Sequence, residues 1–328
     1  MSKGTMSKGL IASRPGGPEA LVWSDLETTP PGEGEALVRH TAIGVNFIDV
    51  YFRKGVYPWP QESMIPGAEA AGVVEALGPG VKGLAVGDRV AYVLKTGAYR
   101  QRRTLGAAHL VKLPDSVSDD VAASVMLKGL TAQYLVTSTY EVKAGDTVLV
   151  HAAAGGVGLL IGQWLKALGA TTIGTAGSAQ KLELARAHGY SHVINYREQD
   201  FVSVVKEITG GRGCEVVYDS VGHDTWRGSL KCLKRFGMFA NFGQSSGMIR
   251  DFALSDLAAG SLSACRPTLF DYIAERSDLE RRSADLFARL TSGEVRADTI
   301  TRRPLEEAAS VHADLEARRT VGATVLIP

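Results

Sequence analysis

The spacing of apolar residues changes character near residue 146 of the 328-residue chain. Before that point, short runs rich in β-branched residues alternate with turns that contain glycine or proline, a pattern typical of a small twisted barrel or partly open sheet. A helix is predicted from residue 119 to about residue 137, with Ser118 as its N-cap and apolar side chains at helical spacing. The strand-like runs occupy residues 35–45, 70–77, 88–93 and 109–114.

From Asp146 onward, apolar strands alternate regularly with helices. Six such strands joined by helical segments predict a parallel, doubly wound sheet. Beyond residue 265 the pattern contains an amphipathic helix around residues 279–290 and a last strand, "GATVLIP". We expect this strand to return to the N-terminal sheet, because a lone strand is not stable. The six strands are expected at residues 147–152, 171–175, 192–196, 214–221, 237–243 and 260–265.

The fold class is therefore α/β with two domains, one inserted into the other. A chain of 328 residues exceeds what one hydrophobic core usually serves, which agrees with this division. We expect residues 1–129 to form the first part of a β-rich domain and residues 130–265 to form the doubly wound domain. Residues 266–328 are then expected to return to the β-rich domain.

The composition is that of an ordinary soluble globular protein, with 45% hydrophobic residues, 22% charged residues and a formal charge of +1. So small a net charge would not attract nucleic acid or an anionic membrane, which favours small, roughly neutral partners. The N-terminal segment lacks an apolar core of signal-peptide length and no later run would span a bilayer, so we expect a cytoplasmic protein. Three widely separated cysteines, Cys214, Cys232 and Cys265, exclude a disulfide framework and are expected to be core thiols.

The stretch "HAAAGGVG" at residues 151–158 follows the first strand of the alternating region. Gly155 would let a phosphate approach the backbone, and Gly158 would let the following helix pack closely on the strand. The spacing is Ala153-x-Gly155-x-x-Gly158, with alanine at the first glycine position of the dinucleotide motif. A tightly packed turn of small residues is the alternative, but the position between a strand and a helix favours a pyrophosphate at the helix N-terminus.

The end of the second strand indicates which nicotinamide cofactor is bound. In "GTAGSAQK", residues 174–181, no Asp or Glu is present to hold the 2′-hydroxyl of NADH. Gly177 and Ser178 would leave room and a hydrogen-bond donor for a 2′-phosphate, and Lys181 would add positive charge. Lys181 alone is equally consistent with a solvated surface lysine. NADPH is therefore favoured over NADH.

Several stretches together resemble the zinc-independent quinone oxidoreductases of the medium-chain dehydrogenase/reductase superfamily. They are "HTAIGVNFIDVYFRKGVYP", "KGLTAQYL", "HAAAGGVG", "VINYREQDF", "VVYDSVG", "FGQSSG" and "ARRTVGATVLIP", and they span nearly the whole chain. The resemblance implies a GroES-like catalytic domain and a Rossmann domain, with NADPH in the cleft between them, and a homodimer. It also implies that no metal is bound.

The metal question depends on the stretch "PGAEAAG". The zinc-dependent relatives carry a ligand histidine in a Gly-His-Glu motif, whereas this chain has Ala68 at that position. It also has "GVN" where those enzymes carry a ligand cysteine. Glu69 alone cannot hold zinc, because a catalytic zinc site needs about three protein ligands.

The resemblance implies two groups of site residues. The reacting groups would be Asn46, Asp49, Tyr51 and Tyr57, from one loop of the first domain, with Thr131 near the nicotinamide. A phenol such as that of Tyr51 would hydrogen-bond a carbonyl oxygen as charge develops. Tyr51 and Tyr57 are as readily core aromatics, and for Asp49 a brace of the loop is favoured over a reacting group. The implied cofactor contacts are Thr131, Gly155, Gly156, Val157, Gly177, Ser178, Lys181, Tyr196, Ser220, Phe242, Gly243, Ser245 and Arg318.

The expected activity is the NADPH-dependent reduction of quinones by transfer of reducing equivalents from the nicotinamide. Reduction of activated C=C bonds in 2-alkenals, enones or 2-haloacrylates is the alternative among enzymes. A non-catalytic NADPH-binding or RNA-binding role is supported only by the basic cluster "YRQRR", so no nucleic-acid partner and no membrane are expected. A homodimer is expected through the edge strand "GSLSAC" of the doubly wound sheet.

Overall fold

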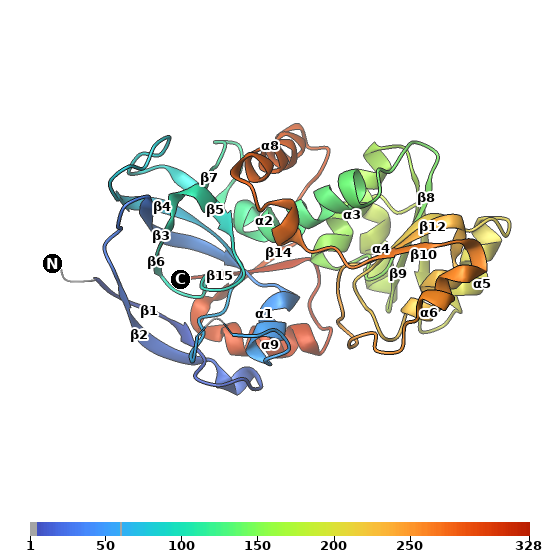
Figure 1. Ribbon diagram of the computed structural model, residues 1–328, viewed down its shortest axis with the longest axis horizontal. Coiled ribbons are helices and arrows are strands. Elements are labelled where there is room, and N and C mark those ends of the chain that lie inside the picture. Colours follow the sequence, from blue (N-terminus) through green and yellow to red (C-terminus); the bar gives the residue numbers. More distant parts are fainter. Residues whose placement is uncertain (1–4, 60) are drawn as a thin grey trace. The chain divides into compact units, whose positions relative to one another are not determined.

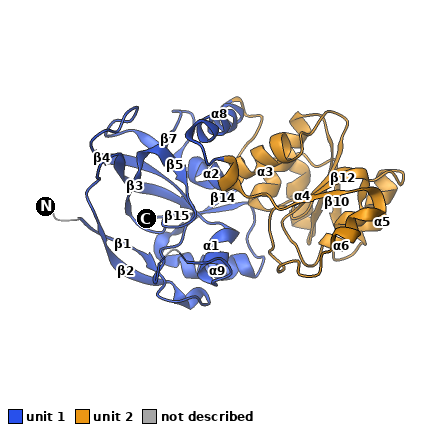
Figure 2. Cartoon of the chain, in the orientation of Figure 1, with its two compact units in different colours: residues 1–127, 273–291, 297–328 blue, residues 128–272, 292–296 orange. Residues whose placement is uncertain are grey.

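A computed structural model describes residues 5–59 and 61–328 of the chain. The chain divides into two compact units, each assembled from separate segments (Figure 2). The first unit comprises residues 1–127, 273–291 and 297–328, and the second comprises residues 128–272 and 292–296. The first boundary falls within the helix α2 (Asp119–Tyr134).

The structure confirms α2 and its predicted cap. The backbone N–H of Val121 donates to the Ser118 hydroxyl at 3.3 Å, as expected of an N-cap. The predicted end near residue 137 falls in a wider π-helical turn (Leu135–Thr139) that continues the helix. The hydroxyl of Tyr218 donates to the carbonyl of Leu135 at 2.8 Å, which satisfies a backbone group in this turn.

Within the described residues, the first unit contains a seven-stranded sheet in the order β14-β15-β3-β4-β5-β7, with β6 also paired to β3 (Figure 1). Neighbours are antiparallel, except that β14 and β15 are parallel. The last strand pairs with β3, Val325 opposite Gly44, which confirms its predicted return. The bounds are β3 (Glu35–Gly44), β4 (Glu69–Leu77), β5 (Arg89–Val93), β6 (Arg102–Gly106), β7 (Val111–Lys112), β14 (Ile300–Pro304) and β15 (Ala323–Ile327).

A separate antiparallel pair, β1 (Thr5–Ile11) and β2 (Val22–Thr28), completes the strands described for this unit. Leu10 of β1 joins the core of the unit together with Ile43 and Tyr92 from the larger sheet. The helices are α1 (Phe47–Arg53), α8 (Arg276–Ser292) and α9 (Ala308–Glu316), of which α8 confirms and extends the helix predicted at residues 279–290. In the part of the chain that the structure describes, no helix is both long and apolar enough to cross a membrane.

The second unit contains the predicted doubly wound sheet (Figure 1). Its strands run in the order β10-β9-β8-β11-β12-β13, and all the pairings are parallel. The strands are β8 (Thr147–Val150), β9 (Thr171–Ala176), β10 (His192–Asn195), β11 (Cys214–Asp219), β12 (Leu233–Asn241) and β13 (Ser263–Cys265). The helices are α3 (Gly156–Ala167), α4 (Ala179–Ala187), α5 (Phe201–Ile208), α6 (Trp226–Lys231) and α7 (Leu269–Tyr272).

The central strands of this sheet are buried on both faces, which explains their continuous apolar sequences. One core cluster includes Leu149, Ile173 and Val217, from three neighbouring strands. Cys214 and Cys232 are core thiols, as predicted, and burial raises the pKa of Cys232 to about 12. Cys265 differs, because it lies on the edge strand β13 and is only partly buried.

A buried carboxylate joins two of the central strands. Glu215 of β11 accepts hydrogen bonds from the backbone N–H of Thr147 and from Lys234 Nζ, both at 2.7 Å, and pairs with Arg212. Burial by itself would raise the pKa of Glu215, but the bonds from Lys234 and Thr147 outweigh it, so the pKa is lowered. The ionised form is therefore the one that stabilises the fold.

We expect Glu215→Gln to lower the stability of the protein by about 2 kcal/mol at pH 7, because a buried charged acceptor is lost. Since the folded-state pKa is lowered, the contribution of Glu215 is fully present above its unfolded pKa of about 4.3 and is lost as the pH falls further. Thermal melts from pH 7 to pH 3 should thus show the variant and the wild type converging at low pH. The exposed Glu207→Gln serves as the control, and a pH-independent gap would contradict the assignment.

Candidate functional site

The turns that follow β8, β9, β10, β11 and β12 all lie at one edge of the second unit's sheet, because the strands are parallel. From β8 the chain continues to β9 on one side, and it later returns to β11 on the other. This reversal of strand order is the topological switch point at which such sheets bind nucleotides. The structure brings these predicted residues to that edge: Gly155, Gly156, Val157, Gly177, Ser178, Tyr196, Ser220, Phe242, Gly243 and Ser245.

The glycine turn after β8 is shaped by two close approaches. A Cβ at Gly158 would lie 2.4 Å from the carbonyl oxygen of Ala152, so only glycine fits there. A Cβ at Gly155 would meet that oxygen at 3.2 Å and nothing closer, so the space beyond Gly155 is open. The helix α3 starts at Gly156, and its first amides have no acceptor within the helix. The turn can therefore hold a phosphate group.

The alanine at the first glycine position of the motif has a physical explanation. The left-handed residue of this turn is Ala152, with φ of 55°, and Ala153 has no positive φ. Ala153 is fully buried, and its Cβ would lie 2.7 Å from a Cβ placed on Gly174 of β9. The turn therefore does not need glycine at residue 153, and the incomplete motif is compatible with phosphate binding.

The carboxyl end of β9 is bordered by side chains from the next strand. A Cβ at Gly177 would lie 2.6 Å from the Tyr196 hydroxyl and 3.2 Å from Arg197 Nε. Tyr196 is 41% exposed, so its ring is available for contact and is not a core aromatic. Ser178 caps α4 by accepting a hydrogen bond from the backbone N–H of Lys181 at 3.4 Å. Glycine, hydroxyl groups and a guanidinium thus meet where an adenosine 2′-substituent is expected.

Arg197 is a site residue that the sequence analysis missed. It directly follows Tyr196, so its place at the end of the third strand was the available signal. Its guanidinium brings a fixed positive charge, with fork geometry suited to phosphate, to the end of β9. Lys181, which the sequence analysis did include, lies in the first turn of α4.

The turns after β11 and β12 are bonded to each other. The backbone N–H of Ser245 donates to the carbonyl of Ser220 at 3.1 Å, and that of Ser246 donates to the carbonyl of Val221 at 2.9 Å. A Cβ at Gly243 would lie 2.6 Å from the Ser220 carbonyl, so this contact requires glycine. Ser220, Gly243 and Ser245 therefore form one rigid rim.

A buried histidine links three strand ends below this edge, and sequence reasoning did not identify it. His151 Nδ1 lies 2.9 Å from the Thr175 hydroxyl, and its Nε2 lies 3.0 Å from the Ser229 hydroxyl. Ser229 donates in turn to Asp219 at 2.9 Å. Burial lowers the pKa of His151, and the charge of Asp219 opposes this only in part. The neutral ring therefore braces the ends of β8, β9 and β11.

In the first unit, Asp49 and Tyr51 lie on a helix and not in a loop, which corrects the prediction for these two residues, whereas Tyr57 lies in irregular backbone after the helix. Asn46 immediately precedes α1, and Asp49 and Tyr51 lie within it. Asp49 Oδ2 accepts the backbone N–H of Asn46 at 2.8 Å, which starts the helix. The rings of Phe47 and Tyr51, four residues apart, contact each other in a tilted arrangement with centroids 5.3 Å apart, which supports the short helix. Short apolar runs do not distinguish such a helix from a strand end.

The aromatic side chains of this region form a partly exposed group. The rings of Tyr51 and Tyr57 meet edge to face with centroids 5.4 Å apart, and Phe47 adjoins Tyr51. All three are partly exposed, so they are not core aromatics.

Two further predicted site residues lie elsewhere in the chain. Thr131 belongs to α2 within the second unit, and Arg318 belongs to the first unit, where it has a φ of 58° after α9.

Glu69, next to the expected metal-ligand position, is a buried hydrogen-bond acceptor. Its carboxylate receives Asn46 Nδ2 at 2.8 Å and the backbone N–H of Leu127 at 2.5 Å. Ala68, at the position of the ligand histidine in zinc-dependent relatives, is fully buried. Across residues 5–59 and 61–328, no three His, Cys, Asp or Glu side chains are grouped so that they could hold a metal ion.

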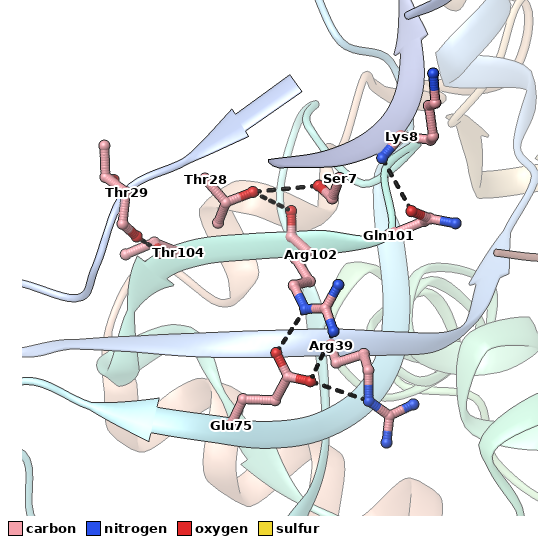
Figure 3. Close-up of polar contacts among 9 residues, drawn as sticks. All are labelled: Ser7, Lys8, Thr28, Thr29, Arg39, Glu75, Gln101, Arg102 and Thr104. Atoms are coloured by element: carbon pink, nitrogen blue, oxygen red, sulfur yellow. Dashed lines mark hydrogen bonds and ion pairs between the residues drawn. The ribbon is translucent and has the colours of Figure 1, made fainter. Parts of the chain in front are cut away.

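The basic cluster "YRQRR" is engaged within the first unit (Figure 3). Arg102 Nε donates to Glu75 at 2.8 Å, and Arg39 pairs with the same carboxylate at 3.1 Å. Arg103 lies over the ring of Tyr92, 5.2 Å from its centroid. The charges of Arg102 and Arg103 are therefore engaged by a carboxylate and a ring of the same unit.

Two family models match the chain. The alcohol dehydrogenase GroES-like domain matches residues 32–142, and the zinc-binding dehydrogenase model matches residues 156–287. A quinone oxidoreductase of Pseudomonas aeruginosa is 46% identical over 325 residues, covering 98% of this chain and 100% of the relative. A 2-haloacrylate reductase of a Burkholderia species is 45% identical over 332 residues, covering 98% of this chain and 99% of the relative.

Among solved structures, quinone oxidoreductase of Escherichia coli in complex with NADPH is similar with a TM-score of 0.94 and 44% identity. The similarity covers 98% of this chain and 100% of the solved chain. The β-rich sheet of the first unit and the parallel sheet of the second agree with the two matched families. The chain therefore belongs to the quinone oxidoreductase family of the medium-chain dehydrogenase/reductase superfamily.

Proposed function

We propose that this protein is an enzyme that reduces quinones with NADPH. The observation that carries the proposal is the similarity to quinone oxidoreductases over 98% of the chain, at 46% identity. The geometry of the second unit supports it, because the glycine turn and the acid-free end of β9 suit a phosphorylated dinucleotide.

The NADPH preference rests on the charge and space at the end of β9. Gly177 allows Tyr196 and Arg197 to approach the backbone closely, Ser178 and Tyr196 offer hydroxyl groups, and Arg197 and Lys181 offer positive charge. An adenosine 2′-phosphate would be held there by charge-assisted hydrogen bonds, whereas a 2′-hydroxyl would find no carboxylate acceptor. The remaining cofactor contacts that we propose are Thr131, Gly155, Gly156, Val157, Ser220, Phe242, Gly243, Ser245 and Arg318.

When bound, NADPH supplies the hydride, and the chain supplies orientation and hydrogen bonds. We assign the acceptor to the aromatic side of α1, where Tyr51 and Tyr57 present phenols beside Phe47. A phenol hydroxyl would donate to a quinone oxygen as negative charge develops on it. Asn46 and Asp49 would hold α1 in place, and Thr131 would lie near the nicotinamide.

Reduction of activated C=C bonds is the second candidate, and one observation favours it: the 2-haloacrylate reductase is 45% identical over 98% of this chain. Hydride delivery would be the same, and only the acceptor would differ.

Steady-state assays with a panel of acceptors distinguish the two functions. We expect the rate of NADPH oxidation with ortho- or para-quinones to exceed the rate with 2-haloacrylates and 2-alkenals. Turnover of the alkenes without any quinone turnover would replace the first function by the second.

Arg197→Ala is expected to weaken NADPH binding about tenfold, or 1.4 kcal/mol, and to leave NADH binding unchanged. The reason is that only NADPH carries the phosphate that the guanidinium would contact. Fluorescence titration of the two nicotinamides measures both affinities. Arg186→Ala, which removes an exposed arginine of α4, is the matched control. Equal losses for the two cofactors would count against a phosphate contact.

The two glycines of the turn are expected to respond differently to alanine. Gly158→Ala should destabilise the protein by about 2 kcal/mol or more, because the Cβ meets the Ala152 carbonyl at 2.4 Å. Gly155→Ala should fold with nearly unchanged thermal stability and bind NADPH at least about tenfold more weakly, since its Cβ would fill the open space. Thermal melts with and without NADPH separate the two effects, and normal cofactor affinity in Gly155→Ala would speak against the cradle.

We further propose a cytoplasmic homodimer. The edge strand β13 leaves backbone groups that a second copy can pair with across a two-fold axis. Phe236 is 66% exposed and Leu254 is 82% exposed, and both belong to elements packed near that edge, β12 and the short helix η4 (Leu254–Gly260). The three cysteines are free thiols, which suits a reducing compartment.

The dimer proposal predicts a solution mass of twice 34.9 kDa by light scattering coupled to gel filtration. Phe236→Asp together with Leu254→Asp should give the monomer mass, because two buried apolar contacts would become unpaired charges. Val86→Asp, an exposed apolar residue of the first unit, is the control. A monomeric wild-type protein would refute the proposal.

A further inference from the structure

The helix α1 has two chemically different faces. Asp49 and Arg53, four residues apart, are both buried, at 1% and 0% exposure. Phe47 and Tyr51, also four residues apart, are partly exposed, and their rings contact each other in a tilted arrangement. Because residues four apart share a helix face, the charged pair and the aromatic pair lie on different sides of the same helix. Whatever holds the charged side therefore also sets the position of the aromatic side.

The charged side is held by a buried chain of hydrogen bonds. Arg53 Nη1 lies 3.2 Å from His312 Nδ1, and His312 Nε2 lies 2.9 Å from the Tyr99 hydroxyl. The Tyr99 hydroxyl in turn donates to Asp49 Oδ2 at 3.0 Å. Arg53 also pairs with Glu316 of α9. The chain of contacts therefore leaves α1 at Arg53, passes through α9 and returns to α1 at Asp49.

Each residue in this series of hydrogen bonds donates to the next, from Arg53 through His312 and Tyr99 to Asp49. The Arg53 guanidinium can only donate, so Nδ1 of His312 must accept and its proton must be on Nε2. Nε2–H then donates to the Tyr99 oxygen, which leaves the Tyr99 proton for Asp49. Burial, together with the neighbouring charge of Arg53, lowers the pKa of His312 to about 3, so the ring stays neutral as this direction requires.

In a second buried tyrosine–histidine pair of the same unit, the hydrogen bond runs the opposite way, from the tyrosine to the histidine. His40 Nδ1 lies 2.6 Å from the Arg100 carbonyl, which can only accept, so the proton is on Nδ1. Nε2 of His40 then accepts from the Tyr92 hydroxyl at 3.0 Å. Tyr92 and Tyr99 are both fully buried. The Tyr92 hydroxyl bonds to His40 and Arg103, which lie outside α1, so Tyr92 is a matched control for Tyr99.

We infer that Tyr99 and His312 are positioning residues that fix α1, and through it Tyr51, for the electron acceptor. The inference rests on the proposed function for its assignment of Tyr51 to the acceptor site. The physical reason is that Tyr99 and His312 connect the two ends of the buried side of α1, so the helix cannot shift or unwind without breaking a buried hydrogen bond.

The test compares Tyr99→Phe with Tyr92→Phe in the full-length protein. Each removes one buried hydroxyl beside a histidine, so both should lower the melting temperature by a similar amount, about 2–4 °C. Only Tyr99→Phe should raise the KM for quinone, by about tenfold, while kcat and NADPH affinity change less than about twofold. Only Tyr99→Phe should also speed amide hydrogen exchange in residues 47–53.

A conservative replacement provides a rescue. His312→Gln can accept from Arg53 with its oxygen and donate to Tyr99 with its nitrogen, whereas His312→Leu can do neither. We expect His312→Gln to retain slow exchange in α1 and a KM near the wild-type value, and His312→Leu to behave like Tyr99→Phe. The inference is overturned if Tyr99→Phe and Tyr92→Phe match each other in both KM and α1 exchange. If the wild type does not reduce quinones, the proposed function fails, and the exchange data alone decide whether Tyr99 and His312 hold α1.

Discussion

Parallel pairing of β8 with both β9 and β11 is the constraint on which the second unit depends. Once these strands are parallel, every turn that follows them lies at one edge, and the reversal of chain direction beside β8 creates a place where no crossover helix covers that edge. The glycine turn, the acid-free end of β9 and the bonded turns after β11 and β12 are useful only because they meet there. His151, buried between three of these strand ends, keeps them together.

Much of this arrangement was predictable from the sequence. Strands buried on both faces are continuous apolar runs, and their alternation with helices left few topologies for residues 147–265. The first unit was harder to predict. The helix α1 has only seven residues, and its buried side is held by Tyr99, which is 50 residues from Asp49, and by His312, which is 259 residues from Arg53. Local patterns carry no information about such contacts.

In the candidate site, too, features set by local sequence were predictable, whereas those that depend on contacts between distant segments were not. Gly155, Gly158 and Gly177 were identifiable because the motif and its spacing follow from the local turn. Arg197 was missed although its neighbour Tyr196 was included, because the sequence does not show that the Arg197 guanidinium is directed toward Gly177 at the end of β9. For Asp49, the sequence analysis favoured a brace of the loop over a reacting group. The hydrogen bonds to Asn46 and Tyr99 favour the brace, because they occupy the carboxylate within the interior of the first unit.

The absence of a side chain at Gly177 has a consequence for attempts to redesign the cofactor preference. An acidic residue introduced there would meet the Tyr196 hydroxyl and Arg197 Nε before it reached any ribose, because a Cβ alone already lies 2.6 Å and 3.2 Å from them. The new carboxylate would pair with the guanidinium and neutralise itself. Cofactor choice thus depends jointly on two neighbouring strand ends, and an acidic residue introduced at position 177 would escape this internal ion pair only if Arg197 were replaced as well.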